Sequence, residues 1–223
     1  MLDAAINSIE KISKNYSDSI KSIELFGGEP LLIKNKPLIK KILDFAESTK
    51  AEITVVTNGV NAGNFIDIFK PLNKQIDMFQ ITIDGIREVH DKRRKYVSGK
   101  GSFDKISKNI DLLLSNDINT NIRVNIDSSN IDYLPDLFDY VKSKKWLDFH
   151  NFNIKPSIVA DHSTLEYNEL IIPEEELLRK LISIYDRYPE LEELFGFYIF
   201  KPLRHVLEII NGAPNASPKF FNC

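Results

Sequence analysis

The sequence contains one cysteine, Cys223, at its last position. One thiol cannot build a disulfide framework, nor a metal site that needs several cysteines from the same chain. Long apolar runs are also missing, because no stretch approaches the roughly 20 apolar residues that cross a bilayer, and the first residues carry no signal-peptide pattern. We therefore expect a soluble, cytoplasmic protein that makes no membrane contact.

Excess positive charge is absent as well. The chain has 29 Lys and Arg against 32 Asp and Glu, a formal net charge of -3, and its only dense basic patch is residues 92–95. Because neutralising phosphates requires clustered Lys and Arg, this balance argues against a general nucleic-acid-binding protein.

Apolar content is sufficient for a large core: 43% of the 223 residues are hydrophobic and 10% are aromatic. Periodicity predicts strands separated by helices, which implies parallel pairing through right-handed crossovers, in either an open doubly wound sheet or a barrel. The predicted strands are residues 23–26, 53–57, 78–83, 121–126 and 149–154, and the predicted helices are 2–12, 38–46, 65–69, 103–114 and 134–141.

The two ends of the chain depart from this alternation. A helix at 2–12 has no preceding strand from which to cross over, so we expect that a first strand is missing. Beyond Pro156 the pattern changes to helices, beginning at Pro173 with acids at 174–176, continuing at 191–200 and 203–210, and ending in a linker at 212–218. We predict a core at 1–155 and a helical extension at 156–223.

Polar and glycine residues gather at the carboxyl ends of four predicted strands, where parallel α/β folds bind ligands. Paired glycines there free the backbone for unusual dihedral angles and for close approach of a ligand. The residues, strand by strand, are Gly27, Gly28 and Glu29; Thr57, Asn58 and Gly59; Thr82, Asp84 and Gly85; and Asn125 and Asp127.

Each of these features also has a purely structural interpretation. The Asn58–Gly59 and Asp84–Gly85 pairs are ordinary turn dipeptides, and Glu29 could be a solvated loop acid. His90–Asp91 is expected in an exposed polar loop, and residues 92–95 as a solvated charge run. The histidines at 150, 162 and 205 have no metal-ligand spacing and are expected to be structural.

Taken together, the motifs are more specific than any of them alone. Their order is Gly-Gly-Glu-Pro-Leu-Leu at 27–32, Thr-Asn-Gly at 57–59, Ile-Thr-Ile-Asp-Gly at 81–85, His90-Asp91, Arg94 and Gly-Lys-Gly-Ser-Phe-Asp at 99–104. This set resembles the radical S-adenosylmethionine (SAM) superfamily, in particular the sulfatase-maturase and peptide-modifying branch with a C-terminal SPASM domain. The resemblance covers residues 1 to about 155, and the helical remainder is similar to that branch's bridge to the SPASM domain.

The resemblance implies a partial (β/α)6 TIM-like barrel that lacks its first strand here. In the family, the loop after that strand carries Cys-x-x-x-Cys-x-x-Cys and holds a [4Fe-4S] cluster. The cluster cleaves bound SAM to a 5′-deoxyadenosyl radical, and the cofactor carries that chemistry while the protein orients it.

The resemblance also implies roles for residues at the strand ends. Gly27, Gly28 and Glu29 would face the methionyl ammonium, and Thr82 and Arg94 would hold the methionyl carboxylate, with Arg93 as the competing choice. Asn125 would lie near the ribose. The cofactor-binding set further includes Thr57 and Asn58, and Asp84 would orient cofactor or substrate as the one catalytic candidate.

The sequence departs from the family at the cluster. Without three cysteines this chain alone cannot make the radical by the family mechanism, and no metal ligand is expected within the barrel. Cys223 matches the position where the SPASM cysteines begin, so it could be an auxiliary-cluster ligand in a full-length protein.

Three functions remain open. The first is a radical SAM enzyme that, in full-length form, modifies a peptide or protein side chain. The second is a barrel without a cluster that acts as a peptide- or SAM-binding scaffold. The third, a barrel enzyme with a phosphate site, is disfavoured because Glu29, directly after the two glycines, would repel phosphate.

Overall fold

The computed structural model describes residues 8, 11, 20–96, 98–159 and 172–195. Its centre is one parallel sheet with the strand order β1-β2-β3-β4-β5. This confirms the expected five parallel strands in consecutive order. Their bounds are β1 (Ser22–Leu25), β2 (Glu52–Thr57), β3 (Ile76–Thr82), β4 (Thr120–Ile126) and β5 (Phe152–Ile158).

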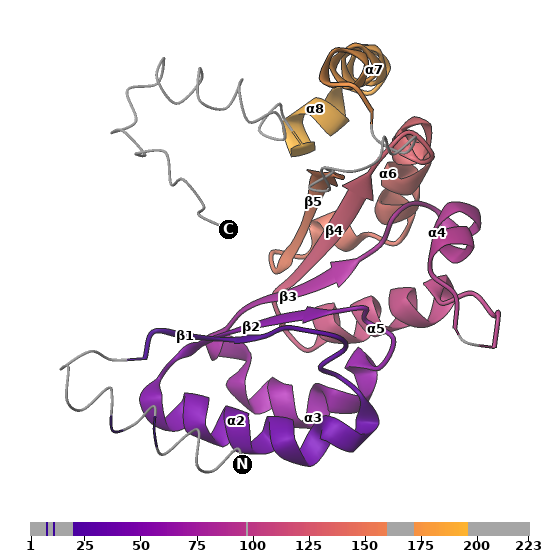
Figure 1. Cartoon of the computed structure of the whole chain (residues 1–223). Helices are drawn as coiled ribbons and strands as arrows, with labels where there is room; N and C mark the ends of the chain where they lie inside the picture. The colour runs from indigo at the N-terminus through magenta and orange to yellow at the C-terminus, as the bar shows by residue number, and fades with distance from the viewer. Residues whose placement is uncertain (1–7, 9–10, 12–19, 97, 160–171, 196–223) are drawn as a thin grey trace, which may run out of the picture.

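Helices connect successive strands and lie together on one side of the sheet, which curves from β1 to β5 (Figure 1). The connecting α-helices are α2 (Lys36–Thr49), α3 (Ile66–Phe69), α5 (Phe103–Ser115) and α6 (Leu134–Ser143). Short 3-10 segments adjoin them: η1 (Ile33–Asn35), η2 (Ala62–Phe65), η3 (Lys70–Gln75), η4 (Ile131–Tyr133) and η5 (Trp146–Asp148). The carboxyl ends of the strands therefore share one edge of the sheet, as the sequence predicted.

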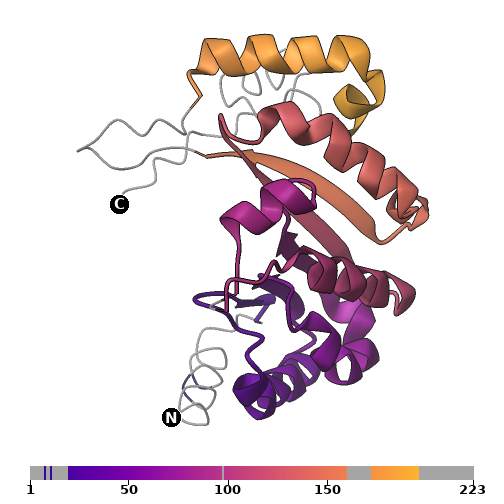
Figure 2. The same ribbon diagram turned by 90° about the vertical axis from the view of Figure 1, so that its right-hand side faces the viewer.

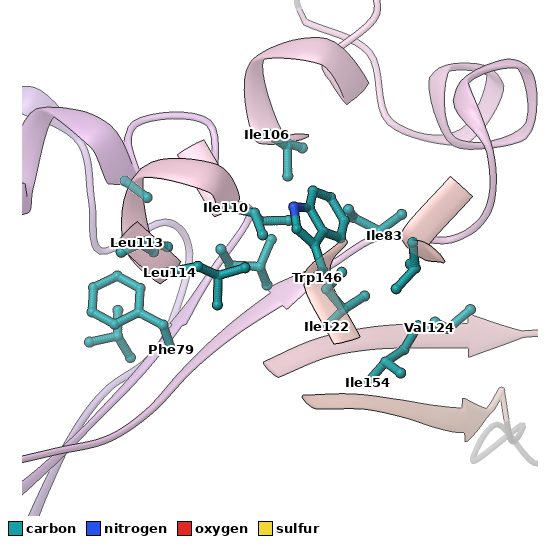
Figure 3. Close-up of a cluster of buried hydrophobic side chains, with 14 of the residues drawn as sticks. Phe79, Ile83, Ile106, Ile110, Leu113, Leu114, Ile122, Val124, Trp146 and Ile154 are labelled. Carbon is teal, nitrogen blue, oxygen red and sulfur yellow. The ribbon is translucent and has the colours of Figure 1, made fainter. Parts of the chain in front are cut away.

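The core fills the space between the sheet and these helices. Ile81 of β3, Ile122 of β4 and Ile154 of β5 face this space and are at most 1% exposed. They contact apolar side chains of α5, and the Trp146 ring lies among these side chains (Figure 3). The Trp146 indole is fully buried and donates from Nε1 to Asp111 Oδ1 at 2.7 Å, which satisfies its polar group.

Two further helices, α7 (Glu174–Arg187) and α8 (Pro189–Phe195), follow β5. Figure 2 shows α7 running beside α6, and Lys180 of α7 pairs with Asp132 of η4. Helix α7 begins at Glu174 with Pro173 as its N-cap, as predicted. The expected helices at 2–12 and 203–210 and the linker at 212–218 lie outside the described residues, as does most of 191–200. Of the helices that are described, none has the length and apolar character needed to cross a membrane.

Two expectations about local structure were wrong. His90 and Asp91 do not lie in a loop, because residues Arg87–Arg93 form the short helix α4 and His90 is fully buried. Strand β5 is also shifted toward the C-terminus, from the predicted 149–154 to Phe152–Ile158. Residues 149–151 instead form the turn between η5 and β5, where the Asn151 side chain donates to the Leu114 and Ile118 carbonyls. The strand thus runs past the core boundary expected at residue 155.

Candidate functional site

Two clusters of polar side chains lie at the carboxyl edge of the sheet. The first is centred on Glu29, after β1, and we call it the Glu29 cluster. Glu29 Oε1 accepts from Thr57 Oγ1 at 2.6 Å and from the Leu31 amide at 2.9 Å, and Oε2 accepts from the Asn58 amide at 2.8 Å. A carboxylate oxygen accepts about two hydrogen bonds, so Oε2 keeps one acceptor position. Glu29 therefore joins the ends of β1 and β2, and it is not a solvated loop acid.

The two glycines before Glu29 leave open space. A Cβ atom built on Gly27 or Gly28 would meet nothing within 4 Å, and Gly27 has φ +115°, a conformation that side chains disfavour. Gly59 differs, because its φ is +78° and a Cβ there would lie 2.7 Å from Ile81 Cγ2. Gly59 is thus required by packing, whereas Gly27 and Gly28 expose their backbone at the edge.

The Asn58 side chain serves the turn in which it lies. Its Oδ1 accepts from the Val60 amide at 2.9 Å, and the Thr57 hydroxyl oxygen accepts from the Gly59 amide at 3.1 Å. These bonds match the turn-forming interpretation of the Thr-Asn-Gly sequence. What Asn58 offers to a ligand is its exposed Nδ2 group.

The second cluster is centred on Asp84, after β3, and we call it the Asp84 cluster. Its carboxylate is 1% exposed. Oδ2 accepts from Arg94 Nε at 2.6 Å, and Oδ1 accepts from the Asn125 amide at 3.2 Å and from Asn125 Nδ2 at 3.1 Å. Asp84 was the catalytic candidate, but protein donors occupy both of its oxygens. We therefore expect Asp84 to position Arg94 and Asn125 without itself reacting.

Arg93, the last residue of α4, and Arg94, its C-cap, differ in how many guanidinium nitrogens have protein partners. Arg93 Nη1 lies 2.7 Å from Asp127 Oδ2 and donates to Ser129 Oγ at 3.0 Å, while its Nε lies 3.5 Å from Asp84. Arg94 uses only Nε, so within the described chain its terminal nitrogens have no protein partner. The expectation of a solvated charge run at 92–95 was therefore wrong for these two residues. Of the two, Arg94 keeps more uncommitted nitrogens, so we expect it to be the one that takes a ligand carboxylate.

Asp127 completes the ionic part of the Asp84 cluster. Its side chain is 1% exposed, and burial alone would raise its pKa. Hydrogen bonds from Arg93 and Ser129 outweigh burial and lower the pKa of Asp127 below its ordinary value. Asp127 is thus a carboxylate that holds Arg93 in place.

His90 links α4 to the strand end through a neutral imidazole. Its Nδ1 accepts from the Asp84 amide at 3.3 Å, and its Nε2 lies 3.0 Å from Ser102 Oγ. The Ser102 hydroxyl donates to the Arg94 carbonyl at 2.9 Å, so the proton between His90 and Ser102 belongs to Nε2. Burial lowers the pKa of His90 to about 4. The imidazole therefore stays neutral near pH 7 and orders the segment that carries Arg94.

The position of Asp91 explains the glycine-rich sequence at residues 99–104. Its Oδ1 accepts from the amides of Ser102 and Phe103, at 2.8 and 2.9 Å, which caps the first turn of α5. A Cβ on Gly101 would collide with this carboxylate. The His90-Asp91 and 99–104 motifs thus close a loop behind Arg94 and do not line a ligand site.

Sequence reasoning missed two residues of the Asp84 cluster. Asn130 Nδ2 donates to the carbonyls of Asp84 and Asn125, both at 2.7 Å, and its Oδ1 accepts from the Asp127 amide at 2.8 Å. Arg123, in β4, donates from Nε to Asn125 Oδ1 at 3.0 Å. The alternation of polar residues at 121, 123 and 125 was the available signal for Arg123.

Thr82 was expected beside Arg94. It is half-buried, it pairs in register with Arg123, and its hydroxyl has no protein partner among the described residues. Within the same part of the chain, no hydrogen bond joins the Glu29 and Asp84 clusters directly. The edge therefore offers an acceptor on one side and donors on the other.

Comparison with known proteins identifies the family. The model of the Radical SAM superfamily matches residues 4–141 of this chain. The chain belongs to the radical SAM superfamily. Its curated relatives include the cysteine-type anaerobic sulfatase-maturating enzyme of Clostridium novyi, 25% identical over 148 residues, which are 62% of this chain and 38% of that enzyme. They also include the GTP 3′,8-cyclase of Campylobacter jejuni subsp. doylei, 28% identical over 136 residues, which are 60% of this chain and 40% of the relative.

The solved structure of native anSMEcpe with bound AdoMet and Kp18Cys peptide has the same fold. It aligns with a TM-score of 0.64 at 19% identity and covers 88% of this chain and 54% of that one. A likeness at this identity supports the fold alone. Because this radical SAM chain spans less than half the length of the two curated relatives, their activities remain a matter for proposal.

The radical SAM superfamily uses SAM and a [4Fe-4S] cluster, and the residues here fit only the first. The open backbone at Gly27 and Gly28, the spare acceptor of Glu29 and the uncommitted nitrogens of Arg94 suit an amino-acid moiety. For the cluster, the sequence has the single thiol of Cys223, which lies outside the described residues. Among the described residues, no three His, Cys, Asp or Glu side chains group as metal ligands. With one cysteine in the sequence, the described residues offer no set of ligands for the cluster.

Proposed function

We propose that this chain forms the SAM-binding part of a radical SAM protein that modifies a peptide or protein side chain. One observation carries the proposal: a carboxylate with a spare acceptor, Glu29, and an oriented guanidinium with spare donors, Arg94, lie at the same edge of the sheet. The methionyl end of SAM is a zwitterion, so it needs one group of each kind. The peptide assignment is supported by the sulfatase-maturating relatives and by the likeness to anSMEcpe, whose structure holds a peptide.

The protein's contribution is binding and orientation. The methionyl ammonium would donate to Glu29 Oε2 and to backbone carbonyls at Gly27 and Gly28, which no side chain covers. The methionyl carboxylate would accept from the terminal nitrogens of Arg94 and from the Thr82 hydroxyl. Bound SAM supplies, in this family, the 5′-deoxyadenosyl radical that abstracts a hydrogen atom.

Asn125 is more constrained than the resemblance implied. Its Nδ2 donates to Asp84 and its Oδ1 already accepts from Arg123, so one acceptor position remains for a ribose hydroxyl. Asn125→Asp would keep the acceptors and lose the bond to Asp84. The proposed ribose contact therefore depends on the orientation that Asp84 gives to the amide.

The test is calorimetric titration of SAM into the wild type and two single variants, Glu29→Gln and Arg94→Ala. Losing a charged partner costs about 1.5–3 kcal/mol, so each variant should bind SAM roughly tenfold to a hundredfold more weakly. Arg87→Ala is the matched control, because Arg87, at the start of α4, pairs with the exposed Asp104. If Arg87→Ala weakens binding as much as Arg94→Ala, the assignment of Arg94 fails.

A second function is favoured by the cysteine count. With one thiol in 223 residues, a scaffold that binds SAM or a peptide without radical chemistry is the alternative. Anaerobic incubation with iron and sulfide should leave this chain colourless and with far less than stoichiometric iron. Four irons per chain, with cleavage of SAM after reduction, would show that the cysteine argument is wrong.

A further inference from the structure

The inner face of the sheet, opposite the helices, is polar over β3, β4 and β5. Residues paired in register point to the same side of a parallel sheet, and the residues that alternate with the buried core positions form this face. Parallel sheets covered on both sides are apolar on both faces. A polar face is therefore expected to meet water or a polar ligand. The residues of this face are Met78, Gln80, Thr82, Asn121, Arg123, Asn125, Asn153, Lys155 and Ser157.

Two cations lie side by side on the inner face. Arg123 of β4 pairs in register with Lys155 of β5. Within the described chain neither has a carboxylate within ion-pair distance, whereas Arg93 and Arg94 are both paired with acids. Like charges directly opposite one another are unfavourable in a sheet. An anion bound between them would remove that cost.

Arg123 is held in a defined direction without being neutralised. Its Nε donates to Asn125 Oδ1 at 3.0 Å and its Nη2 donates to Ser157 Oγ at 2.9 Å. The Asn125 amide is in turn fixed by Asp84, which accepts from its Nδ2. This leaves Nη1 and part of Nη2 to donate. An oriented guanidinium that keeps donors is suited to a planar carboxylate or a phosphate.

A cavity of about 340 Å³ has Lys155, but not Arg123, in its wall. Its lining includes Met78, Asn121, Asn153 and Lys155, with the exposed Asp77 also in its wall. Asn121 is 4% exposed and its Oδ1 has no hydrogen-bond partner. A buried amide oxygen without a partner is unfavourable, and a ligand N–H would satisfy it.

We propose that Arg123 and Lys155 form an anion subsite that recognises an acidic group of the substrate, with Asn121 accepting an N–H beside it. The inference rests on the proposed function in taking the substrate to be a peptide. The shared chemistry is a carboxylate or phosphate anion, and an acidic peptide is favoured for two reasons. Of the two cations, Lys155 is exposed and Arg123 is half-buried. The cavity beside Lys155 offers an amide acceptor, whereas a triphosphate would need further cations.

The test is selection of a random heptapeptide library on immobilised wild-type protein and on variants. The wild type should enrich Asp or Glu at one position at least threefold over the starting library. Lys155→Gln and the double variant Arg123→Gln/Lys155→Gln should lose this enrichment. The control Lys40→Gln/Arg179→Gln removes the same charge from exposed helical positions and should keep it. Unchanged enrichment in the double variant would overturn the subsite.

Two further measurements separate the outcomes. Lys155 is exposed, so Lys155→Gln keeps the fold and decides the test even if the double variant does not. The affinity for SAM should change by less than about twofold in Lys155→Gln. Weak SAM binding would therefore contradict the proposed function and not the anion subsite. In competition with the selected peptide, GTP should displace it poorly. GTP that binds more tightly than the peptide, and loses affinity in Lys155→Gln, would assign the subsite to a nucleotide and overturn the peptide proposal.

Discussion

The two clusters at the carboxyl edge differ in how completely their charges are paired. The Asp84 cluster combines two buried acids, Asp84 and Asp127, with two arginines, and each acid has an arginine partner. The Glu29 cluster has one acid held only by amide and hydroxyl donors. Where charges are matched within the protein, losing one destabilises the fold. Where a charged group keeps an unused hydrogen-bonding position, as Glu29 does, losing that group weakens ligand binding.

The variant expected to have the largest effect, and so to test this comparison most directly, is Asp84→Asn. It keeps the size of the side chain but removes the charge that pairs with the part-exposed Arg94, and losing a charged hydrogen-bond partner costs about 1.5–3 kcal/mol. We expect the free energy of unfolding in urea to fall by that order. Asp104→Asn is the control, because its pair with Arg87 is exposed and should contribute under about 1 kcal/mol. Equal losses in the two variants would contradict the role of Asp84.

His90 gives the Asp84 cluster a pH dependence. The folded pKa of His90 is about 4 and the unfolded value is 6.5, so between these values the unfolded chain binds a proton that the folded chain does not. Stability should therefore fall with pH from 6.5 to 4, by about 3 kcal/mol in total. Asp127, with a pKa lowered from 3.8, loses its contribution only at more acidic pH.

Urea titrations at several pH values measure this slope, with His90→Asn as the comparison. The variant should be less stable at pH 7 but should lack the extra loss between pH 6.5 and 4. A slope in the variant equal to that of the wild type would assign the acid sensitivity to other groups.

Substituting the two glycines of the Glu29 cluster one at a time should distinguish an effect on stability from an effect on SAM binding. Gly27→Ala forces a side chain into φ +115° and should cost about 1–3 kcal/mol of stability. Gly28 has no such φ and open space around it, so Gly28→Ala should change stability by less than about 0.5 kcal/mol. If the ligand approaches here, Gly28→Ala should still weaken SAM binding, by about tenfold. A variant that binds SAM as the wild type does would move the ligand away from Gly28.

The fold was largely predictable because its periodicity is local. Apolar positions repeat within each strand and helix, and strict alternation of strand and helix leaves parallel pairing in consecutive order as the simplest topology. Strand-end residues such as Glu29 and Asp84 follow from the same rule. What failed was α4, where the polar sequence 87–93 is helical and His90 is buried against Ser102 and Phe103, which lie beyond the next loop of the chain.

The pairing within the site could not be read from the sequence. Arg93 and Arg94 are adjacent and chemically identical, and only the positions of Asp127 and Ser129 show that one is committed and the other is not. Asn130 was missed for the same reason, since its bonds reach across the turn to Asp84 and Asn125. Tertiary contacts of this kind leave no periodic signal.

The shifted position of β5 also bears on self-association. Alternate backbone amides of β5 point away from β4, and two of these outward positions are closed to a new strand. The Ile154 amide donates to Asn153 Oδ1 at 2.8 Å, and Pro156 has no amide hydrogen to offer. Features of this kind make a sheet edge less able to pair with a strand of another molecule, which protects it against aggregation. Strand β5 is therefore a poor template for β-sheet growth between copies of this protein.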